Sequence, residues 1–107
     1  MKVRDVSYAS GFIDGEGYIQ YVKLPYKRIR IEVCGTEFTP IRFLLKLFGG
    51  RIYNSSPRIT ITGKKAKPQE IWVVLNRDAC NVCHAILPYI KIERKKEMAR
   101  KIISHYV

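Results

Sequence analysis

The hydrophobic and polar positions along the chain change their period several times, and each period predicts one kind of element. Residues 28–33 alternate between charged and apolar side chains, which is typical of a strand with one exposed face. Apolar residues at positions 41, 44, 45 and 48 instead recur at the spacing of one helix face. The whole pattern predicts helix 5–14, strand 17–24, strand 28–33, helix 40–48, strand 51–54 with 58–62, strand 70–75, helix 77–87 and helix 91–106.

Turn and cap residues set the expected ends of these elements. Gly15 and Gly17 should stop the first helix, and Gly49 with Gly50 should stop the second. Thr39 precedes a proline, which predicts an N-cap followed by proline at the first helical position. Asn76 is expected to cap the third helix in the same way.

The order of elements predicts an α+β fold, with an antiparallel sheet that packs helices on one face, in a single domain of residues 1–107. Alternation also predicts which side chains face the helices. Ile29, Ile31 and Val33 should point inward, with Ile59 and Ile61 on the following strand. Their neighbours Arg28, Arg30, Glu32, Arg58, Thr60 and Thr62 should then point outward.

Charge narrows the class of partner. Twenty Lys+Arg oppose nine Asp+Glu, which gives a formal net charge of +11 and a pI near 9.8. Such an excess favours a polyanionic partner, because each cation that meets a phosphate releases counterions. The chain shows no apolar run of the roughly 18 residues that a membrane span needs, no lipidation motif and no apolar signal-peptide core. We therefore expect an intracellular protein (cytoplasm, nucleoid or organelle) with no membrane partner; a merely basic soluble domain is the alternative.

An outward sheet face rich in Arg, Gln, Thr and Tyr offers both phosphate contacts and hydrogen bonds to base edges. The alternative is an ordinary solvated face, and a packing role for Trp72 is open because of its strand context. The candidate DNA-binding residues are Tyr18, Gln20, Lys23, Arg28, Arg30, Glu32, Arg51, Tyr53, Arg58, Thr60, Thr62, Glu70 and Trp72.

Small residues form a stripe on the first helix. Ser7, Gly11 and Gly15 recur at every fourth position, along which another backbone could pack closely. A glycine inside a helix costs about 1 kcal/mol relative to alanine, and close helix–helix contact would compensate for that cost.

Two carboxylates lie at the end of this helix that disfavours negative charge. Asp14 and Glu16 lie at its C-terminus, where the helix dipole disfavours a negative charge by roughly 0.3–1 kcal/mol. A bound cation would reverse that penalty, and carboxylate oxygens suit Mg²⁺. The alternative is a solvated acidic turn.

Residues 9–17, with the sequence ASGFIDGEG, resemble the LAGLIDADG signature of the homing endonucleases, matching it at Gly11, Asp14 and Gly17. Two further segments resemble the family in the same order. Residues 43–53, FLLKLFGGRIY, are similar to its helix-to-strand passage, and residues 86–90, ILPYI, are similar to its C-terminal Leu-Pro-Tyr-Leu segment.

The resemblance implies the αββαββα fold, whose saddle-shaped antiparallel sheet lies along the DNA major groove. The single motif copy implies a homodimer, with Ser7, Gly11, Asp14 and Gly15 at the interface and Asp14 bracing the helix end. Glu16 would be catalytic and would hold the metal with Gly15. The cofactor would be Mg²⁺, with Mn²⁺ as the alternative, and the activity would be hydrolysis of double-stranded DNA at a long pseudo-palindromic site.

One departure puts that activity in question. Relatives place a lysine five residues after the proline of the Leu-Pro-Tyr segment, and this chain has Glu93 there. Lys95 is the nearby residue that we expect to replace it as a catalytic residue. A true loss would favour a catalytically silent module on the same fold, either a DNA-binding regulator or an intron maturase, and only a maturase would have RNA as its partner.

The cysteines suggest no second chemistry. Residues 80–84, CNVCH, formally match the haem-attachment pattern, but attachment requires export. Cys80 and Cys83 share a helix face, so we expect buried thiols; a zinc site with Cys34 or His105 is the alternative.

Overall fold

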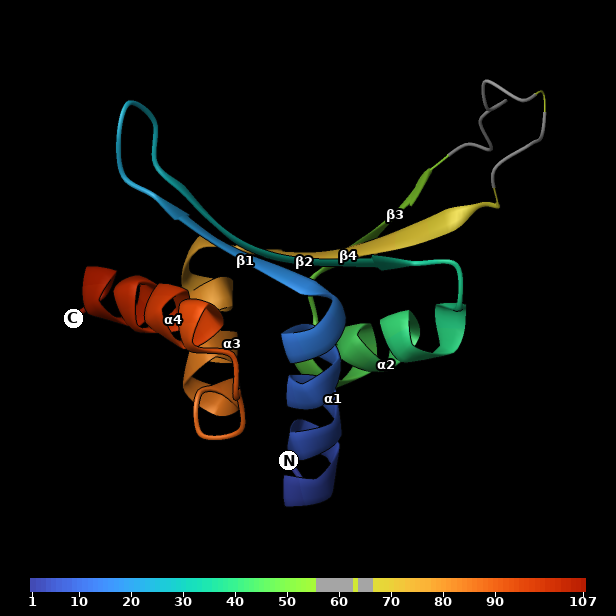
Figure 1. Ribbon diagram of the computed structural model, residues 1–107, viewed down its shortest axis with the longest axis horizontal. Helices are drawn as coiled ribbons and strands as arrows, with labels where there is room; N and C mark the ends of the chain where they lie inside the picture. Colours follow the sequence, from blue (N-terminus) through green and yellow to red (C-terminus); the bar gives the residue numbers. More distant parts are fainter. Residues whose placement is uncertain (56–62, 64–66) are drawn as a thin grey trace.

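A curved sheet divides the molecule into two sides, and the helices lie on one of them (Figure 1). The computed structural model describes residues 1–55, 63 and 67–107. Within these residues the fold is α+β with an antiparallel sheet, as the pattern predicted. The elements are α1 (Val3–Glu16), β1 (Gly17–Val22), β2 (Arg28–Gly35), α2 (Phe38–Phe48), β3 (Arg51–Ser55), β4 (Gln69–Leu75), α3 (Asn76–Ile86) and α4 (Glu93–His105).

The sheet has the strand order β1-β2-β4-β3, so β2 and β4 are its central strands. All neighbours are antiparallel, and Ile31 pairs with Ile19 on β1 and with Val74 on β4. Paired residues share a face of the sheet, and all three of these side chains are buried. The prediction that Ile29, Ile31 and Val33 face the helices is therefore confirmed.

The core fills the space between the sheet and the four helices described. It is built from aliphatic residues of every helix and of β1, β2 and β4, with Trp72 as its largest fully buried side chain. Helix α1 stands below the middle of the sheet, with α2 on one side and α3 with α4 on the other (Figure 1). Its residues Ala9 and Ile13 are fully buried in this core.

Three helix ends differ from expectation. Helix α1 continues through Gly15 to Glu16, because its last carbonyls are capped from another helix, as described below. Helix α2 begins at Phe38, so Thr39 is not its cap; proline is tolerated throughout the first turn and does not fix where a helix starts. Helix α3 begins at Asn76, whose φ is 52°, so the N-cap position belongs to Leu75 and not to Asn76.

Candidate nucleic-acid interface and helix junction

The face of the sheet opposite the helices is concave (Figure 1). The strand register decides which side chains it carries: Glu32 pairs with Tyr18 on one side and with Val73 on the other, and Val73 pairs in turn with Arg51. We name this surface the concave face. Its side chains are Tyr18, Gln20 and Val22 from β1, Arg28, Arg30, Glu32 and Cys34 from β2, Ile71, Val73 and Leu75 from β4, and Arg51 and Tyr53 from β3.

The concave face gathers more than half of the residues predicted to bind DNA. Three arginines stand against one carboxylate, so the face is basic, and two large tyrosines, Tyr18 and Tyr53, are about half exposed. Arginine and tyrosine are suited to phosphate and base contacts. The predicted residues found here are Tyr18, Gln20, Arg28, Arg30, Glu32, Arg51 and Tyr53.

Arg30 and Glu32 form an ion pair on this face. The pair leaves the Arg30 Nε atom buried, with no hydrogen-bond partner among the described residues. A buried donor without a partner is costly, typically by about 1–3 kcal/mol, so this arginine favours an added acceptor. Base edges and phosphate oxygens are acceptors of that kind.

Two predicted DNA-binding residues lie on the opposite side of the sheet. Trp72 is fully buried in the core, where its Nε1 donates to the Gly49 carbonyl at 2.7 Å. Glu70 is 5% exposed and accepts two hydrogen bonds from Arg42, which raises the pKa of that guanidinium. Both assignments were wrong. Residues 71–75 of β4 are all apolar, so the sequence does not show which of them face the helices, and only the pairing with β2 shows it.

Other predicted residues lie elsewhere. Lys23 is exposed just after the end of β1 and lines a hollow with Tyr21 and α4, so its assignment as a DNA-binding residue stays a prediction. Arg58, Thr60 and Thr62, with Ile59 and Ile61, lie outside the described residues. The sequence argument did not include the β4 residues Ile71, Val73 and Leu75, which the register places on the concave face.

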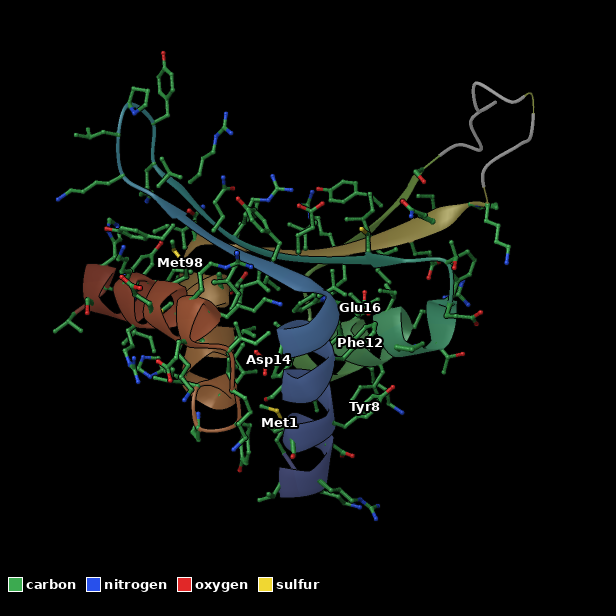
Figure 2. The ribbon with its side chains drawn as sticks, in the orientation of Figure 1. Met1, Tyr8, Phe12, Asp14, Glu16 and Met98 are labelled. Atoms are coloured by element: carbon green, nitrogen blue, oxygen red, sulfur yellow. The ribbon has the colours of Figure 1, made fainter. Side chains whose placement is uncertain are left out.

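The junction between α1 and β1 brings together the two predicted catalytic residues. Glu16 is exposed at the last position of α1, directly below the sheet (Figure 2). Lys95 is 8% exposed, and its Nζ donates to the Ile13 carbonyl at 3.1 Å and to the Asp14 carbonyl. Burial lowers the pKa of Lys95, and the negative charges of Asp14 and Glu16 oppose that shift.

Asp14 points from α1 toward the start of α4, on the side away from Tyr8 and Phe12 (Figure 2). Its carboxylate accepts the backbone N–H of Lys91 at 2.8 Å and that of Ile92 at 3.2 Å. Asp14 is 9% exposed, and its hydrogen bonds are contacts within the subunit; its place in a dimer interface stays a prediction. Its expected role in bracing the helix end agrees with these bonds.

The small-residue stripe faces away from the rest of the subunit. Ser7, Gly11 and Gly15 are exposed. A Cβ atom added at Gly11 or Gly15 would meet no atom within 4 Å among the described residues. Packing inside the subunit therefore does not explain why these positions are glycine.

Oxygen donors for a metal are few in one subunit. The exposed Glu16 carboxylate and the adjacent Gly15 carbonyl are hard oxygen ligands of the kind that Mg²⁺ prefers. The described part of the chain holds no group of three His, Cys, Asp or Glu residues that could bind a metal ion. A complete site would need further oxygens from a second subunit, a phosphate or water.

The cysteines of α3 are packing residues. Cys80 and Cys83 are buried, and burial with the neighbouring Cys80 raises the pKa of the Cys83 thiol to about 12. A thiol held protonated in this way is a poor nucleophile and a poor metal ligand. The expectation of buried thiols is confirmed for these two residues; Cys34 is exposed on the concave face.

No family model, no curated protein and no solved structure matches this chain. No helix of the described residues is long and apolar enough to cross a membrane.

Proposed function

We propose that this protein is a homing endonuclease of the LAGLIDADG type, which binds double-stranded DNA as a homodimer and hydrolyses it with Mg²⁺ or Mn²⁺. The observation that carries the proposal is that the Lys95 ammonium binds the carbonyls of Ile13 and Asp14 at the end of the motif-like helix, where Glu16 is exposed. An exposed carboxylate and a buried ammonium there occupy one helix end, where the chain enters β1 two residues before Tyr18 of the basic concave face.

Each residue at the helix end has a distinct proposed task. Glu16, with the Gly15 carbonyl, offers oxygen ligands beside the scissile phosphate. A divalent metal bound there would activate a water molecule and neutralise charge on the phosphate. Lys95, whose pKa is lowered by burial, would hold its amino group beside the reaction site and help to polarise it.

The concave face supports recognition of duplex DNA. Its arginines would contact phosphates or guanine edges, and Gln20 and Glu32 carry the groups that pair with adenine and cytosine edges. The net charge of +11 attracts a polyanion such as DNA over long range.

The exposed stripe of α1 supports the homodimer. Two copies packed along Ser7, Gly11 and Gly15 would bring two Glu16 carboxylates toward one axis, which supplies the oxygens that a single subunit lacks. Two-fold symmetry then requires a palindromic or nearly palindromic target.

One observation favours a second candidate, the catalytically silent binding module. The Lys95 ammonium already donates hydrogen bonds to two backbone carbonyls, so it has a structural role whether or not it takes part in catalysis. Under this alternative the concave face would bind DNA, or RNA in a maturase, and Glu16 would be an ordinary exposed carboxylate.

Glu16→Gln separates the candidates, because it removes the charge of the carboxylate and keeps its size. We expect this variant to lose DNA cleavage in Mg²⁺ while retaining the dissociation constant of the wild type in Ca²⁺. Glu97→Gln is the control, because Glu97 is an exposed carboxylate on α4 whose partner is Lys101. Cleavage by Glu16→Gln at the wild-type rate would eliminate the proposed role of Glu16.

A further inference from the structure

Strand β4 carries apolar side chains on both of its faces. Trp72 and Val74 enter the core, while Ile71, Val73 and Leu75 alternate with them and line the concave face. A strand with this composition is typical of a sheet that is covered on both sides. All four helices described lie on the core side, so within the described residues no helix covers the outer row (Figure 1).

The outer row differs from its surroundings. Arg30 pairs with Leu75, and Val73 lies between Glu32 on β2 and Arg51 on β3, so charged residues with a net positive charge flank an apolar line along a central strand of the sheet. Leu75 is 49% exposed and Ile71 is partly exposed, whereas Val73 is only 8% exposed. A partner that carries negative charge and presents apolar groups at its centre would suit this line.

We propose that Ile71 and Leu75 recognise the C5-methyl groups of thymines in the major groove of the target. Among the base edges in that groove, the thymine methyl is the apolar group. An aliphatic side chain placed against a polar base edge removes water and returns no hydrogen bond, which is costly. Leu75 and Ile71 therefore favour thymine in two ways. They disfavour polar base edges, and they bury the thymine methyl group.

The spacing of the two residues sets a spacing in the target. Four residues along a strand span about 13 Å at roughly 3.3 Å per residue. Nucleotides on one DNA strand advance by roughly 3.4 Å, so a β-strand that follows the groove places the two thymines about four base pairs apart in each half-site. A preference for thymines at this spacing would show that the apolar side chains contact their methyl groups, because a general preference for A·T pairs would show no fixed spacing.

This inference rests on the proposed DNA binding, so the experiment first selects duplexes from a randomised pool in Ca²⁺. Each thymine of the selected duplex is then replaced by deoxyuridine, which removes the methyl and keeps every hydrogen-bonding group. We expect two positions per half-site, about four base pairs apart, at which the substitution weakens binding about fourfold, the factor that corresponds to one buried methyl group.

The second part of the experiment repeats the binding measurements with the variant Leu75→Ala. In this variant one of the two sensitive positions should lose its discrimination between thymine and deoxyuridine, as a double-mutant cycle requires for a direct contact. Leu45→Ala is the matched control, because Leu45 is 37% exposed on α2, on the other side of the sheet; both positions should stay sensitive.

The outcomes separate the two proposals. If no duplex is enriched, the proposed function fails, and the inference fails with it. If duplexes are enriched but deoxyuridine has no effect, or Leu75→Ala keeps the same discrimination, only the thymine inference is overturned. If Leu75→Lys changes the oligomeric state in the absence of DNA, the row is covered by a second copy of the chain and not by thymine.

Discussion

Lys95 and Asp14 connect α1 to α4 in both directions. The Lys95 ammonium donates to the backbone carbonyl of Asp14 at the end of α1, and the Asp14 carboxylate accepts two backbone N–H groups just before α4 begins. A helix end that lacks partners within its own helix is thus satisfied by the other helix. The arrangement fixes the position of Glu16, two residues after Asp14.

Asp14→Ala should therefore destabilise the fold by about 2–4 kcal/mol, because it leaves the N–H groups of Lys91 and Ile92 without their charged acceptor. Urea unfolding measures the loss. Glu97→Ala, which removes an exposed i,i+4 partner of Lys101, should cost less than about 0.5 kcal/mol. Equal losses in the two variants would show that the Asp14 bonds do not hold the helices together.

The lowered pKa of Lys95 makes stability depend on pH. In the pH window between the lowered pKa of Lys95 in the folded chain and its usual value of 10.5, this residue is more often protonated in the unfolded chain than in the folded chain. The resulting destabilisation is fully present below the folded pKa and is relieved as pH rises toward 10.5.

Relative to Lys95→Met, the wild type should therefore gain unfolding free energy as pH rises through this window. The comparison cancels the titration of the other lysines and tyrosines. Urea unfolding of both proteins across the window provides the test, and a difference that falls with pH would contradict the assigned direction.

Gly50 should be much less tolerant of alanine than its neighbour Gly49. Both have positive φ, 96° and 76°, so either substitution meets backbone strain of about 1–3 kcal/mol. A Cβ at Gly50 would also lie 2.6 Å from the Val73 carbonyl oxygen, whereas at Gly49 it meets open space. Thermal or urea unfolding should place Gly50→Ala clearly below Gly49→Ala. Similar stabilities would mean that β3 can shift away from β4 at little cost.

Gly11→Leu should abolish the proposed homodimer without harming the subunit. A Cβ atom added at Gly11 meets no atom within 4 Å among the described residues outside its own helix backbone, and leucine is a better helix former than glycine by roughly 0.8 kcal/mol. Light scattering should show monomers, and circular dichroism should show the wild-type helix content. Dimers that persist in this variant would place the interface on another surface.

The sequence was sufficient for the strands whose two faces differ in polarity. Residues 28–33 alternate, so both the existence of β2 and the orientation of Arg30 and Glu32 followed from the pattern. Strand β4 has no alternation, and Glu70 and Trp72 were placed on the wrong face because only the β2 pairing defines its phase. Long-range pairing of this kind is not encoded in local composition.

The candidate site, too, was predictable from the sequence only in part. The position of Glu16 at a helix end was predictable from the spacing of glycines and acids. The contact between Lys95 and the end of α1 joins residues 81 positions apart and was only a guess from the sequence. Asp14 has the same composition signal as Glu16, yet it is buried, because α4 starts beside it.

The most direct test of the central claim exposes a pool of randomised duplex DNA to the protein with Mg²⁺, and a second sample with Ca²⁺. Sequencing of the cleaved ends and of the bound molecules then identifies any target. The account predicts staggered ends at one nearly palindromic site in Mg²⁺, and the same site bound but intact in Ca²⁺. Enrichment of a site that stays intact in both metals would contradict the endonuclease and leave a DNA-binding module.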